Sequence, residues 1–369
     1  MKNKKTGLAL QSLYSSLISI FIGLLIGFIV LLIISPSGAT EAIKGIVLNF
    51  MTRSSQAAKM KSLGNTLAKT APLLMCALSV CFCYKVGLFN IGCPGQYEAG
   101  AGAALFCALG LHLPWYVCLL AAAVAGAALG AISGALKAYR SVNEVISGIM
   151  LNWITLYMVN TILNTNGIKD PQSPYTLNLS KVNEGGLIPS LGLSSLFANN
   201  RTVTIAIPLS IVFAIVIYVI LTKTKFGYEL QATGFNKEAA RYAGMREKRN
   251  IIVTLAIGGA LAGIGAAFLF LCGYQQWSVT ETSVPGMGFN GIAATFLGGL
   301  HPIGTIFSSF FIQNITDGGT LINRTVYPSQ ISDLISAIII YSCGFAAFFK
   351  MMIGNVSNRK AKKPEGGKS

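Results

Sequence analysis

The chain has 369 residues, of which 53% are hydrophobic and only 11% are charged, with a mean hydropathy of +0.62. This composition excludes an ordinary soluble domain and predicts that most of the chain lies in lipid. The net charge of +16 would suggest nucleic-acid binding in a soluble protein, but here the basic residues fall in short segments between apolar runs. We therefore expect membrane lipid, and no nucleic acid, as a partner.

The first apolar run, Leu13–Ile34, has no charged residue over 22 positions and can cross a hydrocarbon core of about 30 Å. A cleavable signal peptide is the alternative, because the chain starts with the basic sequence MKNKK. The run is longer than the apolar core of a typical signal peptide and lacks a clear small-x-small cleavage site. We therefore interpret it as a retained anchor.

Nine further apolar runs follow, which gives ten predicted crossings. With residues 1–12 inside, the basic connections and the tail, 350–369, fall on the cytoplasmic side. The sequence therefore predicts an all-α integral membrane protein with about ten transmembrane helices, a single domain over 1–369 whose membrane part is 13–349. The nine runs are Leu67–Tyr84, Tyr97–Leu111, Trp115–Leu136, Val145–Leu163, Thr202–Leu221, Ile251–Leu271, Phe289–Leu300, Pro302–Ile315 and Ile331–Phe349.

Three of these runs, Tyr97–Leu111, Phe289–Leu300 and Pro302–Ile315, are short and rich in glycine. Backbone that is broken at membrane depth must line a cavity or be buried in protein, so we expect a substrate path there. The segments that enter the first two, GLFNIGCPGQ at Gly87–Gln96 and GMGFNGIAA at Gly286–Ala294, resemble each other. This pattern is typical of two inverted five-helix halves with broken helices near the midplane. A chance likeness is the alternative, because the chain has 40 glycines and GFN occurs again in a cytoplasmic loop.

Amide and aromatic side chains gather at these two breaks. An amide both donates and accepts hydrogen bonds, and an aromatic ring offers a flat face, so together they suit a planar, polar, uncharged ligand such as a nucleobase or nucleoside. The alternative is that the amides only cap the ends of broken helices. The predicted substrate-path residues are Phe89, Asn90, Gln96, Tyr97, Asn152, Phe289 and Asn290.

Carboxylates inside a membrane are costly and are natural sites for coupled ions. Glu98 is the candidate ion site, with capping of backbone N–H groups as its alternative role. For Glu144, which follows Arg140, we expect an interfacial salt bridge. The sequence has no GxxxxGK[ST] phosphate loop, no Ser-His-acid grouping and no CxxC spacing, so we predict no catalytic residue, no metal site and no cofactor in this chain.

The segment ATGFNKEAARYAGMREKRN, Ala232–Asn250, is basic and rich in alanine, and it separates two long apolar runs. We predict a short helix from Asn236 with basic side chains around a face of small residues. Such a face can dock into a groove of another protein, whereas the alternative is an ordinary basic loop that sets the topology. The small residues are Ala239, Ala240, Ala243 and Gly244.

Four motifs in the chain resemble a known family. ELQATGFNKEAARYAGM is similar to the cytoplasmic coupling segment of ABC importer permeases of the branched-chain amino acid, simple sugar and nucleoside superfamily. GLFNIGCPGQYEAGA resembles the family's GLFNIG-x-EGQ motif, NEVISGIMLNWI its NEVI-x-x-IMLN segment, and FNGIAATFLGGLHPIG its G-IAVALLG-x-x-P-x-G segment. The motifs spread over most of residues 66–315 in the family's order, and the GLFNIG form points to the nucleoside-type subgroup.

The resemblance implies a non-catalytic permease subunit of an ATP-driven nucleoside importer in a bacterial cytoplasmic (inner) membrane. It implies pairing with a second permease as a heterodimer, a cytoplasmic ABC ATPase that holds ATP and Mg, and an external substrate-binding lipoprotein. The alternatives are a permease for simple sugars or branched-chain amino acids, and a secondary transporter driven by an ion gradient through Glu98. Pro94 stands where the family pattern has Glu, which leaves the substrate open. In the coupling segment, 223–250, the residues implied to transmit motion are Gly234, Asn236, Ala239, Ala240, Arg241 and Gly244.

Overall fold

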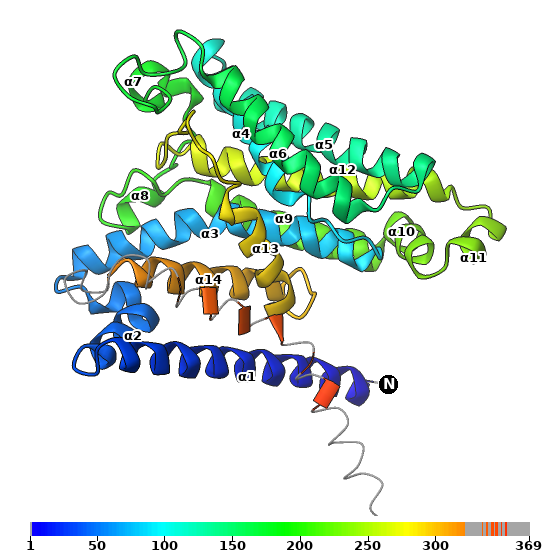
Figure 1. Cartoon of the computed structure of the whole chain (residues 1–369), viewed down its shortest axis with the longest axis horizontal. Coiled ribbons are helices and arrows are strands. Elements are labelled where there is room, and N and C mark those ends of the chain that lie inside the picture. Colours follow the sequence, from blue (N-terminus) through cyan, green and yellow to red (C-terminus); the bar gives the residue numbers. More distant parts are fainter. Residues whose placement is uncertain are drawn as a thin grey trace, which may run out of the picture. The chain divides into compact units, whose positions relative to one another are not determined.

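The computed structural model describes residues 2–321 and the isolated positions 334, 337–338, 341–342, 344–345, 348 and 351–352. Every regular element in this part of the chain is a helix, as the composition predicts (Figure 1). The chain forms two compact units. Unit 1 contains residues 1–52, 296–299 and those from 314 onward, and unit 2 contains residues 53–295 and 300–313.

The described part of unit 1 contains α1 (Lys2–Ile34), α2 (Ala39–Leu48) and η1 (Asn49–Thr52) at the start of the chain, together with the end of α14 (Gly304–Gly319). Asn314 of α14 joins these elements. Its Oδ1 accepts a hydrogen bond from Asn49 Nδ2 at 3.2 Å, and its Nδ2 donates to the Val47 carbonyl at 3.0 Å. The second bond gives the Val47 carbonyl, at the end of α2, a side-chain donor.

Unit 2 carries the segments that the sequence singles out as functional. In Figure 1 the short helices α7 and α8 lie at one end of this unit, and α10 and α11 lie at the other. Its elements are α3 (Gln56–Lys85), α4 (Cys93–Leu105), η2 (Phe106–Gly110), α5 (Trp115–Arg140), α6 (Glu144–Leu163), α7 (Leu179–Val182), η3 (Glu184–Gly186), α8 (Leu193–Leu196), α9 (Ala206–Lys223), α10 (Lys225–Phe235), α11 (Lys237–Tyr242), α12 (Glu247–Phe270), most of α13 (Gly286–Leu297) and the start of α14.

Helix α12 packs on α5 through small residues. A Cβ atom on Gly259 would collide with the carbonyl oxygen of Gly126, and one on Gly126 would collide with the carbonyl oxygen of Gly259. One turn along α5, a Cβ on Gly130 would collide with the carbonyl oxygen of Leu255. Such close backbone approach is typical of membrane helices, in which small residues replace the bulky side chains of a soluble core. This contact fixes α12, and with it α4, which packs on both α5 and α12.

We expect Gly259→Ala to lower the thermal stability of the purified protein by the equivalent of about 1–3 kcal/mol, because the added methyl group overpacks the contact with α5. Gly45→Ala in α2 is the control, since a Cβ there meets nothing within 4 Å. Alanine is the better helix former, so the control should match or exceed the wild-type unfolding midpoint. Equal midpoints for the two variants would contradict the close approach of α5 and α12.

Six of the described helical stretches are long and apolar enough to cross a membrane: Tyr14–Ile34 in α1, together with α3, α5, α6, α9 and α12. Large apolar side chains such as Leu120, Val124 and Ile154 are exposed on α5 and α6, as expected for side chains that face lipid. The protein is therefore a multi-pass membrane protein. Of the other four predicted spans, three coincide with the shorter helices α4 with η2, α13 and α14, and Ile331–Phe349 lies outside the described residues except for isolated positions.

The start of α3 differs from the predicted boundary by 11 residues. The apolar run begins at Leu67, but the helix begins at Gln56, because the Ser55 hydroxyl accepts a hydrogen bond from the Ala58 N–H at 3.2 Å. A serine N-cap of this kind stabilises a helix start by about 1 kcal/mol. Hydropathy finds the part of a helix that lipid or protein buries, and it does not detect a polar first turn.

Candidate functional site

The GLFNIGCPGQ segment forms the turn between α3 and α4, where two of the predicted path amides bond to each other. Asn90 Nδ2 donates to Gln96 Oε1 at 2.8 Å, and Gln96 Nε2 donates back to Asn90 Oδ1 at 3.0 Å. Asn90 Nδ2 also donates to the Ser79 hydroxyl of α3 at 3.0 Å. All three side chains are buried. In this conformation the amide pair, Asn90 and Gln96, therefore fixes the turn by satisfying its own polar groups.

Asn152 of α6 supports the start of α4 from a neighbouring helix. Its Oδ1 accepts a hydrogen bond from the Gly95 N–H at 2.9 Å, and its Nδ2 donates to the Ile91 carbonyl at 3.1 Å. Gly92, at the N-cap position, has no side chain to do this. The structure thus favours the capping interpretation for Asn152. The same interpretation is wrong for Glu98, because both of its buried carboxylate oxygens lack a hydrogen-bond partner.

The two glycine-rich segments meet at Pro94. A Cβ on Gly288 of α13 would lie 2.6 Å from the Pro94 nitrogen, and one on Gly291 would lie 2.7 Å from the Cys76 Cβ of α3. Helix α13 therefore packs directly on the start of α4. Pro94 lies in the first turn of α4, where a residue needs no amide hydrogen to bond. Phe289 is 42% exposed, so its surroundings differ from those of the buried amide pair.

Tyr97 is the predicted path residue that reaches a cavity. The cavity has a volume of about 480 Å³ and is lined by α4, the end of α12 and the loop that precedes α13. Its volume falls in the range of small-molecule sites. The Tyr97 hydroxyl is buried and has no hydrogen-bond partner. Tyr97 directly follows Gln96, so the cavity wall and the amide pair belong to the same turn of chain.

The predicted coupling helix is shorter than expected. Asn236 Oδ1 accepts a hydrogen bond from the Ala239 N–H at 3.0 Å and starts α11, which ends at Tyr242. Gly244 follows the helix with a φ of +80°, in open space, and Ala240 is buried against the chain's own helices. The prediction of one continuous face of small residues is therefore wrong, because its members belong to two different local structures and one of them is covered.

Large side chains are exposed where small ones were expected. Phe235 is 87% exposed and Tyr242 is 92% exposed, and the exposed Arg241 lies beside Tyr242. Aromatic and arginine side chains of this kind carry much of the binding energy of protein interfaces. Neither aromatic side chain was predicted as a contact, because the prediction rested on the small residues and the basic charge of the segment. A groove of about 580 Å³ in the same segment is lined by Thr222, Lys223, Thr224, Lys225, Tyr228, Glu229, Gly244 and Met245.

Gly234, one of the predicted coupling residues, packs against another segment of this chain. A Cβ on Gly234 would collide with the carbonyl group of Val86, and one on Gly87 would lie 3.0 Å from the Gly234 carbonyl oxygen. The end of α10 thus packs, backbone on backbone, on the turn that begins the GLFN motif. Gly87 is only three positions from Asn90 in the sequence. A short and closely packed path therefore joins the coupling segment to the amide pair.

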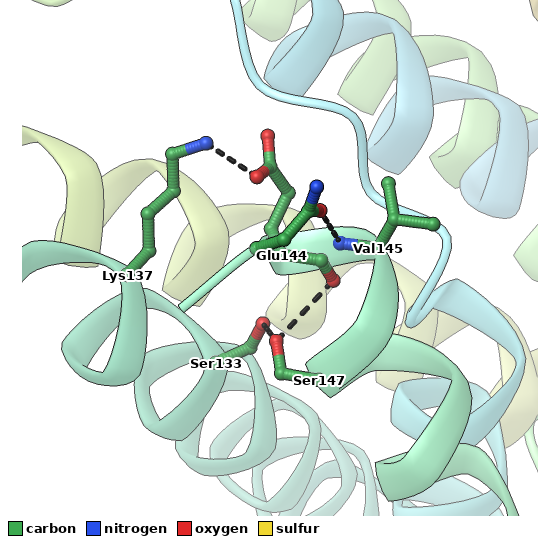
Figure 2. Close-up of polar contacts among 6 residues, drawn as sticks. Ser133, Lys137, Glu144, Val145 and Ser147 are labelled. Atoms are coloured by element: carbon green, nitrogen blue, oxygen red, sulfur yellow. Dashed lines mark hydrogen bonds and ion pairs between the residues drawn. The ribbon is translucent and has the colours of Figure 1, made fainter. Parts of the chain in front are cut away.

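The ends of α5 and α6 are held together at the connection between them. Lys137 and Glu144 form an ion pair, and the hydroxyl oxygens of Ser133 and Ser147 lie 3.0 Å apart in a hydrogen bond (Figure 2). The expected salt bridge of Glu144 is present, but its partner is Lys137 and not Arg140. The reason is that α6 runs back along α5, which brings its first turn beside a residue almost one turn before the end of α5.

Comparison with known proteins agrees with these features. The family model described as branched-chain amino acid transport system / permease component matches residues 62–343. The nucleoside ABC transporter permease protein NupB of Lactococcus lactis is 32% identical over 308 residues, which cover 82% of this chain and 84% of the relative. The guanosine ABC transporter permease protein NupP of Bacillus subtilis is 30% identical over 362 residues, which cover 95% of this chain and 99% of the relative.

A glucose ABC transporter permease protein of Haloferax volcanii is also similar, with 30% identity over 78% of this chain and 77% of the relative. No solved structure gives a significant match. The resemblance noted in the motifs is confirmed, because the family model matches more than half of the chain. The chain belongs to the family of branched-chain amino acid transport system permease components, and it is a multi-pass, non-catalytic subunit of a transport system.

Proposed function

We propose that the chain is a permease subunit of an ATP-driven importer of nucleosides. The observation that carries the proposal is the similarity to the guanosine permease of Bacillus subtilis, which extends over 95% of this chain and 99% of that protein. The nucleoside permease of Lactococcus lactis supports it independently. The chain would translocate the solute, while the chemistry of ATP hydrolysis, with its Mg, belongs to a partner.

We propose a second permease as the partner in the membrane, in a heterodimer. Two guanosine permease proteins of Bacillus subtilis resemble this chain, one at 30% identity over 99% of its length and the other at 28% over 82%. Two nucleoside permease proteins of Lactococcus lactis do so as well, at 32% and 26%. Two diverged relatives of similar name in each organism are what a heterodimer of two permeases predicts. The solute would come from an external binding lipoprotein.

We propose that the membrane domain, 13–349, has ten spans in two inverted halves in the bacterial cytoplasmic membrane, with residues 1–12 and the tail 350–369 inside. The contact between Pro94 and Gly288 supports this arrangement, because it brings the two similar glycine-rich segments together. The path for the solute would then run between α4, α6 and α13.

We propose that the coupling segment, 223–250, binds the ABC ATPase through Phe235, Arg241 and Tyr242 and through the groove beside Gly244. These side chains are exposed in a basic segment, which supports a protein contact. Motion of α10 would pass through Gly234 to the turn at Gly87, and from there to the amide pair. The amide pair would then change its hydrogen bonds when the path opens.

Import of a simple sugar is the second candidate, because the glucose permease of Haloferax volcanii has a similar identity to this chain. Uptake of labelled guanosine distinguishes the two in cells that lack their own nucleoside uptake and express the whole transporter. We expect unlabelled nucleosides, in about hundredfold excess, to suppress uptake, and glucose and leucine to leave it unchanged. Glucose uptake without guanosine uptake would overturn the nucleoside assignment.

Asn90→Ala should lower uptake and ATP hydrolysis together, because it removes the partner of the buried Gln96 amide at a cost of about 1–3 kcal/mol. Asn290→Ala is the comparison, since Asn290 is only half-buried. If Asn290 contacts the solute, its variant should lose uptake and keep ATP hydrolysis. Normal uptake and an unchanged unfolding midpoint for Asn90→Ala would contradict the role of the amide pair in the turn.

A further inference from the structure

The cavity beside Tyr97 has an aromatic wall. The ring centroids of Tyr97 and Phe270 lie 6.4 Å apart, and those of Phe270 and Trp277 lie 5.6 Å apart, with interplanar angles of 54° and 56°. All three residues line the cavity. Tyr175, which is 46% exposed, is a fourth aromatic residue in the lining. The wall therefore offers ring edges and faces to which another flat ring can pack.

The remaining lining supplies hydrogen-bonding groups. One carboxylate oxygen of Glu281 accepts a hydrogen bond from the Ser283 hydroxyl at 2.8 Å, and Gln276 donates through Nε2 to the Thr176 carbonyl at 2.6 Å. The carboxylate can accept further hydrogen bonds, and the Gln276 side-chain oxygen is an acceptor. The polar residues in the lining are Gln275, Gln276, Ser278, Glu281 and Ser283.

The loop that carries these groups is held in place by two neighbours. Trp277 Nε1 donates to Asn160 Oδ1 of α6 at 2.9 Å, and Asn160 Nδ2 donates to the Glu281 carbonyl at 2.8 Å. The Trp277 backbone exchanges hydrogen bonds with Thr176, at 3.2 and 2.9 Å. The cavity wall is therefore organised before any ligand binds, which lowers the entropy cost of binding.

The cavity lies far from the coupling segment. Phe270 ends α12, and the helix starts at Glu247, close after α11. Its 24 residues rise by about 36 Å, roughly the thickness of a bilayer core. With the coupling segment on the cytoplasmic side, the cavity opens toward the external side, where a solute arrives.

The Tyr97 hydroxyl points to the kind of occupant. A buried hydroxyl without a hydrogen-bond partner is unfavourable, and native proteins rarely keep one unless a ligand or water supplies the partner. Tyr97 is 1% exposed and lies in the cavity wall. Because the hydroxyl oxygen is fully buried in this conformation, a polar solute in the cavity would become its partner once the Tyr97 side chain turns toward the cavity.

We propose that this cavity is the external entry site of the permease and that it binds the base of a nucleoside, a flat heteroaromatic ring with hydrogen-bond donors on its edge. This assignment rests on the proposed function. The base packs against the aromatic wall, the Tyr97 hydroxyl bonds to its edge, and the Glu281 carboxylate accepts hydrogen bonds from its N–H groups. A carboxylate favours an edge rich in donors, so the site should prefer guanosine to inosine, which lacks the exocyclic amino group.

Tyr97→Phe tests the assignment in the complete transporter, purified with its partners. We expect it to weaken guanosine binding about tenfold, which corresponds to the loss of one hydrogen bond, and to leave the ligand-free unfolding midpoint equal or higher. Tyr157→Phe on α6, where the side chain is 57% exposed, is the matched control and should bind guanosine as the wild type does. A structural role for the Tyr97 hydroxyl would instead lower the midpoint.

Glu281→Gln tests whether the Glu281 carboxylate accepts hydrogen bonds from the N–H groups of the base. This substitution should weaken the binding of guanosine more than that of inosine, so that the ratio of the two affinities falls toward one. Gln172→Leu in the external loop should leave this ratio unchanged. Equal guanosine affinity in the wild type, Tyr97→Phe and Glu281→Gln would overturn the site while leaving the proposed function intact. A wild-type transporter that takes up no nucleoside would instead contradict the proposed function.

Discussion

Gly244→Trp should abolish import while the permease remains inserted and folded. Gly244 lines the groove of the coupling segment, and a Cβ there meets nothing within 4 Å of its own chain. A tryptophan side chain would therefore fill the groove without disturbing the fold of this subunit, and it would exclude the part of the ATPase that we propose to dock there. Uptake by reconstituted transporter at matched membrane levels measures the effect, which we expect to exceed about hundredfold, or about 2.8 kcal/mol of coupling.

Gly192→Trp is the matched control for this substitution. Gly192 has a φ of +84°, compared with +80° for Gly244, and a Cβ on it also meets nothing within 4 Å. Both substitutions therefore introduce similar backbone strain, about 1–2 kcal/mol for a side chain in the left-handed region. Only the Gly244 variant blocks the coupling segment. An equal loss of uptake in the two variants would show that strain, and not docking, determines the result, and normal uptake by Gly244→Trp would contradict docking at the groove.

Gly234→Ala should uncouple the transporter. The added methyl group would collide with the Val86 carbonyl, so the end of α10 must move away from the turn at Gly87. We expect uptake to fall by about tenfold or more and ATP hydrolysis to lose its response to the loaded binding protein, because α10 no longer drives the turn. ATP hydrolysis and uptake are measured on the same proteoliposomes.

Gly45→Ala is the control for this second substitution, because it adds the same methyl group to a helical glycine where a Cβ meets nothing within 4 Å. It should keep most of the uptake. Wild-type coupling in Gly234→Ala would contradict the path from α10 through Gly87 to the amide pair. A loss of the protein from the membrane would show that the contact is needed for folding alone.

The sequence predicts the long helices well and their polar ends poorly. An apolar run of about 20 residues can be satisfied in lipid only as a helix, so α5, α6 and α12 follow from hydropathy. The start of α3 depends on the Ser55 cap, which lies before the apolar run, whereas α11 starts at the predicted Asn236, whose side chain caps it. Asn236 was a readable signal, because asparagine is a preferred N-cap.

The candidate site is predicted by residue type but not by contact. The motifs identify Asn90, Gln96 and Asn152, yet whether an amide faces a solute or caps a helix depends on which partner lies within about 3 Å in the fold. Gly234 was predicted from its motif to take part in coupling to the ATPase, but the motif does not show that a Cβ on it would collide with Val86, which is remote in the sequence. Likewise, only the direction of the turn after α5 decides that Glu144 pairs with Lys137.

The source of energy for transport tests the central claim most directly. The permease is reconstituted in proteoliposomes with its second permease, its ATPase and its binding protein, and uptake of labelled guanosine is measured with ATP present or absent on the ATPase side. The account predicts uptake that requires ATP and the ATPase and that persists when ion gradients are collapsed. Uptake by the permease without ATP, driven by an imposed proton or sodium gradient and lost in Glu98→Gln, would contradict it.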